Sequence, residues 1–398
     1  MKLSKPLSAL IGSLLISSTA IAATNTPSLE EMWNLIQQQQ QEIQTLKASL
    51  NQTRNEVEAS ADIIDEISTV SPTTVSKTQV GGYGELHYNS LTNQAVGGGD
   101  NKNTVDLHRF VMFLNHQFND KIRFFSELEV EHAMIEGATG GAVEMEQAFL
   151  EFDISPETRI RAGMQLIPVG IINETHEPNT FYGTERNPIE KNIIPTTWRE
   201  AGAMLKGRWG AGWSYDLAYT SGLDLSAANT VRSGRTNVSN APAKSGLFSG
   251  RIKWAGWKGV ELASTLMYQD DYNQGQLASK GQARLWETHA VVQRGPYSLR
   301  ALYADWNLSD KTSGYDRQTG WYIEPSYKIN SQWGLFTRYN RWDNQAGDST
   351  DSVYKQLDIG ANYWPHKDVV VKIDYQNQKT PTGKDEYDGV NVGLGYQF

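Results

Sequence analysis

The chain of 398 residues contains no cysteine, so neither disulfides nor thiolate metal sites contribute to its fold or chemistry. No stretch after the N-terminal segment approaches the roughly 18 apolar residues of a transmembrane helix. Basic residues are in deficit, with 36 Lys and Arg against 45 Asp and Glu and a formal net charge of −9. Without a basic excess, we expect no nucleic-acid partner.

The N-terminus has the pattern of a secretory signal peptide. Lys2 and Lys5 precede a short apolar run at residues 7–16, and Ala20 and Ala22 form a small-x-small cleavage motif. We expect residues 1–22 to be removed. No cysteine follows the cleavage site, so no lipoprotein anchor is expected.

Aromatic residues and glycine are abundant, with 12 Trp, 18 Tyr and 35 Gly. At the C-terminus, apolar residues alternate strictly with small or polar ones, which predicts a strand with one apolar face. Those apolar positions are Val390, Val392, Leu394, Tyr396 and Phe398. The segment resembles the closing strand of bacterial outer-membrane barrels, a resemblance that makes Tyr396 and Phe398 an assembly signal. An ordinary amphipathic edge strand is the alternative.

The same alternation recurs along residues 79–398 and predicts about sixteen strands. We expect them near 79–91, 104–118, 121–134, 142–154, 158–166, 200–208, 212–222, 245–254, 257–270, 281–294, 297–308, 318–329, 333–343, 353–363, 368–377 and 387–398. Tight turns and long loops alternate between them. The predicted fold is all-β: an antiparallel transmembrane β-barrel of about 16 strands, with short turns facing the periplasm of a Gram-negative cell.

Charges fall on one face of several predicted strands. In 121–134, Arg123, Glu127 and Glu129 alternate with apolar residues such as Leu128 and Val130. A charge on the lipid face near the midplane costs roughly 2–4 kcal/mol, so these charges should face a polar lumen. A barrel of this strand count leaves an aqueous channel.

Residues 28–69 differ in kind, because apolar residues recur there every seven positions. Those at one heptad position are Leu29, Ile36, Ile43, Leu50, Val57 and Ile64. This spacing predicts an N-terminal α-helical coiled coil in the periplasm, followed by a linker at 70–78. Such a helix alone is marginally stable, so we expect it to rely on partner chains. A solvated single helix is the alternative.

The longest predicted loop, residues 167–199, mixes charges of both signs and contains four prolines. Loops of this length in compact domains are usually functional. It occupies the ordinal position of the loop that folds into the lumen of general porins. We expect it to fold inward and narrow the channel; a surface flap over the mouth is the alternative.

Three motifs in and before this loop are specific. They are Arg159-Ile160-Arg161-Ala162-Gly163-Met164-Gln165, then Pro168-Val169-Gly170, then Phe181-Tyr182-Gly183-Thr184-Glu185-Arg186. Together they resemble the phosphate-selective porin O and P family, and the coiled coil resembles that of its dicarboxylate-channel branch. The resemblance implies a trimer of sixteen-stranded barrels with a basic constriction, and it carries Arg159, Arg161 and Arg186 over to that site.

We therefore expect an outer-membrane porin that passes small hydrophilic solutes, with anions such as phosphate or carboxylates preferred. A weakly selective general porin is the alternative. The predicted constriction consists of Arg123, Arg159, Arg161, Arg186, Lys191 and Arg199. Glu127, Glu129 and Glu185 are the lumenal acids expected near it. Expected partners are further copies of the chain, outer-membrane lipid and the barrel assembly machinery.

Other classes fit less well. None of the seven histidines lies in a Gly-x-Ser-x-Gly or His-Glu-x-x-His context, so a barrel enzyme is the less favoured class. A zinc site at His176-Glu177 lacks a second ligand at helical spacing, and neither a metal nor a cofactor is expected. A tether or adhesin built on the coiled coil is a third class, which the charged lumen disfavours.

Overall fold

The computed structural model describes residues 77–133 and 140–398. The predicted signal peptide and coiled coil lie outside the described residues. No helix in the described part of the chain is long and apolar enough to cross a membrane.

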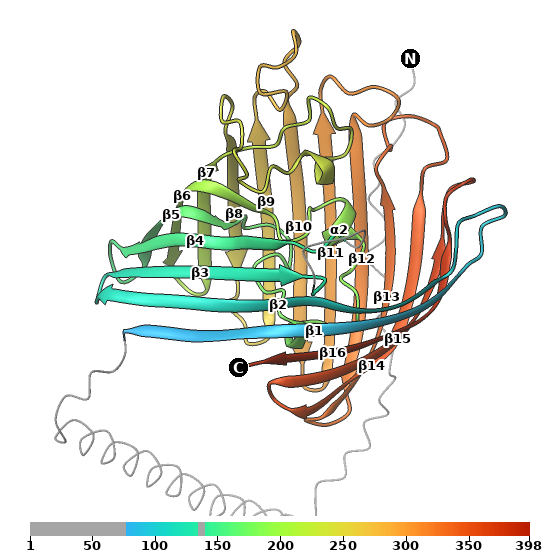
Figure 1. Cartoon of the computed structure of the whole chain (residues 1–398). Helices are drawn as coiled ribbons and strands as arrows, with labels where there is room; N and C mark the ends of the chain where they lie inside the picture. The colour runs from blue at the N-terminus through green and yellow to red at the C-terminus, as the bar shows by residue number, and fades with distance from the viewer. Residues whose placement is uncertain (1–76, 134–139) are drawn as a thin grey trace, which may run out of the picture. The chain divides into compact units, whose positions relative to one another are not determined.

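Sixteen antiparallel strands follow one another around a closed barrel, in which β1 also pairs with β16 (Figure 1). The strands are β1 (Thr78–Asn93), β2 (Lys102–Asn119), β3 (Ile122–Glu131), β4 (Val143–Asp153), β5 (Thr158–Leu166), β6 (Arg199–Trp209), β7 (Trp213–Thr220), β8 (Leu247–Trp254), β9 (Val260–Gln269), β10 (Ala283–Arg294), β11 (Tyr297–Leu308), β12 (Arg317–Lys328), β13 (Trp333–Asp343), β14 (Tyr354–His366), β15 (Val369–Lys379) and β16 (Tyr387–Gln397). The predicted strand count and antiparallel barrel are confirmed.

Alternation along each strand sorts its side chains between the two faces of the wall. On β10, Trp286 is 51% exposed on the outer face, whereas the next residue, Glu287, is fully buried on the inner face. On β15, outward Val371 and Ile373 flank Lys372, which points inward to the carbonyl of Gly183. The outer face is therefore apolar and exposed, as a lipid-facing wall requires.

Aromatic rings gather at the short-turn end of the barrel. Trp209, Trp213, Trp254 and Trp257 form a chain of neighbouring rings, with centroids 5.8, 6.4 and 5.1 Å apart. Further along the wall, Trp333 stacks on the ring of Tyr363. Such rings suit the polar–apolar boundary of a bilayer, so they form an aromatic girdle at this end of the wall.

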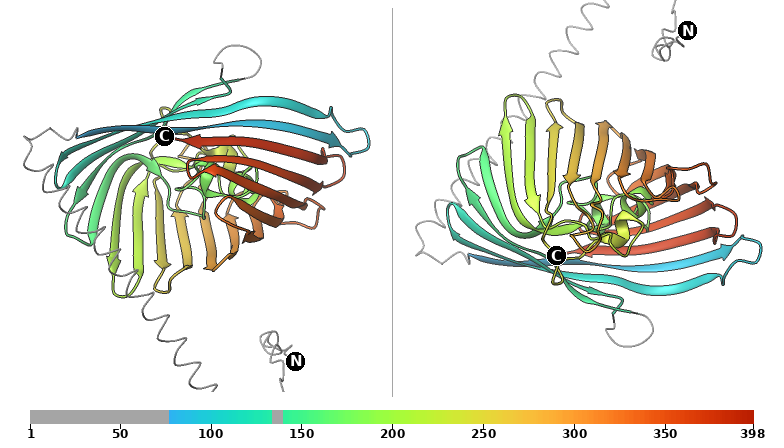
Figure 2. Two further views of the ribbon diagram at one scale, coloured as in Figure 1. Left: turned by 90° about the horizontal axis from the view of Figure 1, so that it is seen from below. Right: turned by 90° about the horizontal axis from the view of Figure 1, so that it is seen from above.

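Two long connections run inside the ring of strands (Figure 2). Residues 167–198 carry the short helices η1 (Pro178–Thr180) and α2 (Ile189–Asn192), and residues 221–246 carry η2 (Val231–Gly234). Trp306 of β11 donates a hydrogen bond to the carbonyl of Ile193, and Gln318 of β12 donates one to that of Asn229. Both loops therefore dock on inner-facing side chains of the wall.

The inner face is not polar throughout, which corrects the expectation of a wet lumen. Along β9 to β13, apolar side chains point inward and pack against the two loops. This cluster, which we call the inner core, contains Ile167, Val169, Ile189, Ile193, Ile194, Trp198, Leu223, Leu225, Val231, Leu285, Leu302, Trp306 and Tyr322 among others. Each buried side chain of this size contributes about 1.5–3 kcal/mol, so the loops are held as part of the fold.

β-Bulges interrupt the alternation in the wall near the first strands. The pairing of β1 with β2 shifts between Glu85 and Leu86, opposite His108, and that of β3 with β4 shifts between Glu127 and Leu128, opposite Glu146. A bulge adds one residue to one strand and re-aims its side chain. His108 and Glu146 thereby join the inner face, where strict alternation would direct them to lipid.

Candidate functional site

The tip of loop 167–198 is bound to the wall by cations and by one carboxylate. Arg338 donates to the carbonyl of Tyr182 at 3.2 Å, and Lys372 donates to that of Gly183 at 2.9 Å. The backbone N–H of Thr184 donates to Asp374 at 2.7 Å. The loop tip therefore crosses the lumen to β13 and β15.

The first part of the same loop is fixed to other strands. Arg109 of β2 donates to the carbonyl of His176 at 2.8 Å. Glu174 forms ion pairs with Arg251 at 2.6 Å and with Lys206 at 3.1 Å. Contacts on several sides of the barrel thus hold the loop across its interior.

Glu190 organises the loop internally. Its carboxylate accepts hydrogen bonds from the backbone N–H groups of Ile171 and Ile172 at 2.7 and 2.8 Å, and from the hydroxyl of Tyr322 at 3.1 Å. Gly170 has φ +72°, and a Cβ there would lie 2.3 Å from the Glu190 carboxylate. Only glycine suits both this backbone conformation and this close approach.

Three predicted constriction residues, Arg123, Arg159 and Arg161, converge on two acids near the short-turn end. Arg161 donates to Glu151 at 2.7 Å, and Arg123 contacts both Glu151 and Asp153. Arg159 pairs with Asp153 at 3.1 Å. The arginines share one network, but their charge is largely balanced there.

Two adjoining cavities open beside this network, with volumes of about 240 and 480 Å³. Both are lined by Arg161, Lys206, Arg251 and Lys253, which we call the wall cations. Alternation along β5, β6 and β8 places all four on the inner face of the wall. Asp216 pairs with Lys206 and Arg251, and Glu261 pairs with Lys253. A solute in these cavities contacts basic side chains that are already held in ion pairs with acidic residues of the wall and the inner loop.

A second group of cations lies where the two inner loops meet. It consists of Arg186, Arg199, Arg232 and Arg235, which we call the loop arginine cluster. Arg232 donates to the carbonyl of Lys191 and the hydroxyl of Thr196, while Arg235 donates to the carbonyl of Thr196. Within residues 77–133 and 140–398, Arg186, Arg232 and Arg235 form no ion pair. Among the described residues no carboxylate is in ion-pair contact with these three guanidinium groups, although Glu131, Glu144 and Glu146 attract them from farther away.

Burial, and for Arg235 also like charge, lowers the pKa values of two arginines in this cluster. Burial lowers the pKa of Arg232. Burial, together with the charges of Arg232, Arg199 and Arg186, lowers the pKa of Arg235 to about 10. When the charged form of a group is disfavoured in this way, a nearby anion stabilises that charged form.

The remaining predicted cations are divided. Arg199, at the start of β6, is buried and pairs with Glu144. Lys191 has an exposed side chain, and only its carbonyl takes part, as an acceptor for Arg232. The six predicted cations therefore do not form one ring: Arg123, Arg159 and Arg161 lie in one network, and Arg186 and Arg199 lie in another.

Within the described residues, the predicted lumenal acids do not contact the arginines of the predicted constriction and have other partners. Glu127 and Glu129 are buried on the inner face, and Glu127 accepts hydrogen bonds from Gln147 and Tyr83. Glu185 accepts from Asn89 and lies 3.2 Å from the Nδ1 of His87. The acids that balance the predicted arginines are Glu144, Glu151 and Asp153 instead.

Sequence reasoning missed Arg232, Arg235, His108 and Glu146. The first two lie in loop 221–246, whose inward course depends on tertiary contacts with Thr196 and Gln318. The other two occupy β-bulges, which a strict period of two does not anticipate. The available sequence signal for an inward course was the apolar residues Leu223, Leu225 and Val231 within that loop, because a solvent-exposed loop is usually polar.

Comparison with known proteins identifies the class. The model of the Gram-negative porin family matches residues 58–383, so the chain belongs to this family. A protein of Aquifex aeolicus (strain VF5) without a characterised function is 30% identical over 345 residues, which cover 77% of each chain. The family and the closed barrel indicate an outer-membrane channel for small solutes.

Two solved structures share the fold. An anion-selective porin from Comamonas acidovorans has a TM-score of 0.59 at 12% identity, covering 81% of this chain and 99% of that one. The outer-membrane channel DcaP of Acinetobacter baumannii has a TM-score of 0.57 at 13% identity, covering 81% and 97%. These likenesses concern the barrel and do not extend to a solute.

Proposed function

We propose that this porin prefers small hydrophilic anions, such as phosphate or carboxylates, and that the loop arginine cluster selects them. The observation that carries the proposal is the absence of ion-pair partners for Arg186, Arg232 and Arg235 among the described residues. A guanidinium offers a fork of N–H donors that matches the two oxygens of a carboxylate or phosphate. An anion that enters between the two inner loops would reduce the repulsion among these arginines.

The wall cations extend the same preference toward the short-turn end. Arg161, Lys206, Arg251 and Lys253 line neighbouring cavities with their charges held by fixed acids. Balanced pairs of this kind orient solutes and bind them weakly, which suits a site that an ion must also leave. This arrangement supports the predicted resemblance to the phosphate-selective porin O and P family.

A weakly selective general porin is the second candidate function. Buried Glu127, Glu129 and Glu146 place three carboxyl groups on the inner face of β3 and β4. The overall charge of the chain is also negative, at −9. In this case the two sets of charges would create a transverse field without a preference for either sign.

The assembly proposal rests on the predicted heptads at residues 28–69, which favour association with partner chains in the periplasm, and on the family resemblance, which implies three chains. Removal of residues 1–22 and insertion by the barrel assembly machinery, with Phe398 in its signal, complete the proposed route. Detergent-extracted protein should migrate as a trimer on native gels. A monomer with full conductance would contradict this arrangement.

Liposome swelling tests the solute preference. We expect a sugar acid to enter vesicles containing this protein faster than the neutral sugar of the same carbon skeleton. Arg232→Glu combined with Arg235→Glu should remove that difference, because it reverses two charges that have no ion-pair partner among the described residues. Lys258→Glu is the matched control, since Lys258 is exposed in the turn between β8 and β9. Equal rates for both solutes in the unmodified protein would favour the general porin.

A further inference from the structure

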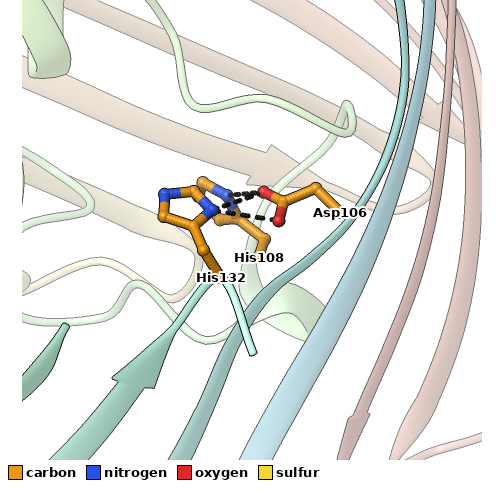
Figure 3. A group of neighbouring side chains, drawn as sticks. All are labelled: Asp106, His108 and His132. Carbon is orange, nitrogen blue, oxygen red and sulfur yellow. Dashed lines mark hydrogen bonds and ion pairs between the residues drawn. The ribbon is translucent and has the colours of Figure 1, made fainter. Parts of the chain in front are cut away.

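Two histidines and an aspartate meet at the long-loop end of β2 and β3, apart from the cations of the proposed constriction. Asp106 and His108 belong to β2, and His132 directly follows the last residue of β3. Figure 3 shows the two imidazoles turned toward the Asp106 carboxylate. No hydrogen bond or ion pair links these three residues to the inner loops within the part of the chain that the structure describes.

The β-bulge in β2 creates half of this arrangement. Asp106 pairs across the strands with His87, whose side chain is buried on the inner face. The register shift then inserts His108 as the extra residue, and its ring stacks on that of His87 with centroids 4.4 Å apart. Asp106 and His108, two positions apart, therefore share the inner face with Arg109.

An unfavoured backbone conformation supplies the third residue. His132 has φ +54° and Ala133 has φ +57°, a region that residues with a Cβ rarely adopt. The N–H of His132 donates to the carbonyl of His108 at 3.4 Å, which joins the end of β3 to the bulge. This turn carries the His132 ring back to Asp106.

The resulting distances are those of a chelating site. The Nδ1 of His132 lies 2.9 Å from both carboxylate oxygens of Asp106, and the Nδ1 of His108 lies 3.2 Å from one of them. One ligand atom from each residue lies within 4.8 Å of the other two. Ligands at about 2.0–2.2 Å from a tetrahedral ion are about 3.3 Å apart, so small side-chain movements suffice.

The side chains are open to water as well as preorganised. Their exposed fractions are 26% for Asp106, 38% for His108 and 35% for His132. An ion can therefore reach the three ligands and keep water in its remaining positions. Two imidazole nitrogens and one carboxylate are suited to borderline metals such as zinc, nickel and copper, and poorly suited to magnesium or calcium.

We propose that Asp106, His108 and His132 bind a divalent transition-metal ion through Nδ1 of each histidine and the aspartate carboxylate. Binding displaces any proton on the two Nδ1 atoms and involves no change of oxidation state. The bound ion places positive charge on the inner face of the wall beside His87, which contacts Glu185 of the inner loop. Metal binding should therefore also alter conduction.

Zinc binding to the untagged full chain in detergent, followed by calorimetry, tests the proposal. We expect one zinc ion per chain, and His108→Ala and His132→Ala should each weaken binding by at least about tenfold. His366→Gln is the matched control. His366 also faces a carboxylate, Asp368 at 3.5 Å, but it is the last residue of β14, at the short turn that leads to β15. Unchanged affinity in both alanine variants would overturn the proposal.

Copper provides a second readout that does not depend on affinity. Electron paramagnetic resonance of the Cu²⁺-loaded protein should show coupling to two imidazole nitrogens in the unmodified chain and in His366→Gln, but to one in His132→Ala. Heat-modifiable migration on gels shows that each variant is folded. Two coupled nitrogens in folded His132→Ala would assign the ion to other residues and refute the site.

Discussion

The backbones of Gly82 and Phe398 exchange two hydrogen bonds, at 3.0 and 2.9 Å, and so close the barrel at the last residue of the chain. A Cβ at Gly82 would lie 2.2 Å from the carbonyl oxygen of Val111, so glycine is needed for this close approach. The Phe398 side chain is 64% exposed and lies near the ring of Phe110. Backbone closure and the outward aromatic ring are therefore separate features of the same residue.

Phe398→Ala separates the backbone closure from the aromatic ring, because it keeps the backbone hydrogen bonds and removes the ring. If the ring is part of the assembly signal, outer-membrane levels should fall several-fold while purified protein still refolds. Fractionation and heat-modifiable gels measure the two quantities. Phe118→Ala is the control, since Phe118 is also an exposed ring, at 51%, near the end of β2. Equal losses in both variants would show that exposed aromatic area alone matters.

Deleting residues 175–195 should raise single-channel conductance. This segment contains the loop tip that Arg338 and Lys372 bind across the lumen. A planar bilayer recording gives the measurement, and deletion of the exposed residues 347–350 in the β13–β14 loop gives the control. Unchanged conductance after the larger deletion would mean that this loop does not limit the channel.

Trp306→Ala tests how firmly the inner core holds that loop. Trp306 is fully buried, packs near Trp198 and donates to the carbonyl of Ile193 at 3.0 Å. Removing it should cost about 3–5 kcal/mol of unfolding free energy. Thermal unfolding should shift downward and current noise should increase. Trp257→Ala, an exposed girdle residue, should leave the noise unchanged.

Glu174 makes the loop anchorage dependent on pH. Burial raises the pKa of Glu174, but the charges of Arg251 and Lys206 lower it more, so that the pKa lies below its usual range. The stabilisation is then complete above the unfolded pKa of about 4.3 and is lost only as the pH falls through the lower folded value. Glu174→Gln removes it at every pH.

The difference in unfolding temperature between the unmodified protein and Glu174→Gln should therefore stay constant from about pH 7 to 5 and shrink only in stronger acid. At neutral pH it should correspond to roughly 1.5–3 kcal/mol, the contribution of hydrogen bonds to charged groups. A difference that already disappears near pH 6 would show that Glu174 is not held as a charged anchor.

The barrel was predictable because a membrane wall imposes one rule on every strand. Residues such as Val371 and Lys372 must face opposite sides, and the turns between strands carry small or polar residues. Local sequence therefore predicts most of the strands to within a few residues. It also places Arg161, Lys206 and Arg251 on the inner face, where the structure finds them.

The site was less predictable, because partners across the lumen are not encoded locally. Nothing near Arg235 in the sequence indicates that its guanidinium meets Thr196, or that Arg199 and Arg186 lie close by. Alternation also fails at bulges, so it does not predict that His108 lies on the inner face with Arg109. The inner core along β9 to β13 was missed because apolar residues on both faces weaken the pattern.

The reversal potential of single channels in a salt gradient tests the central claim most directly. If the loop arginine cluster selects anions, the unmodified protein should show a reversal potential whose sign corresponds to a higher permeability for chloride than for potassium. Arg186→Glu, or Arg232→Glu with Arg235→Glu, should move it toward zero or beyond, while Lys258→Glu leaves it unchanged. A cation-selective potential in the unmodified protein that these charge reversals do not alter would contradict the account.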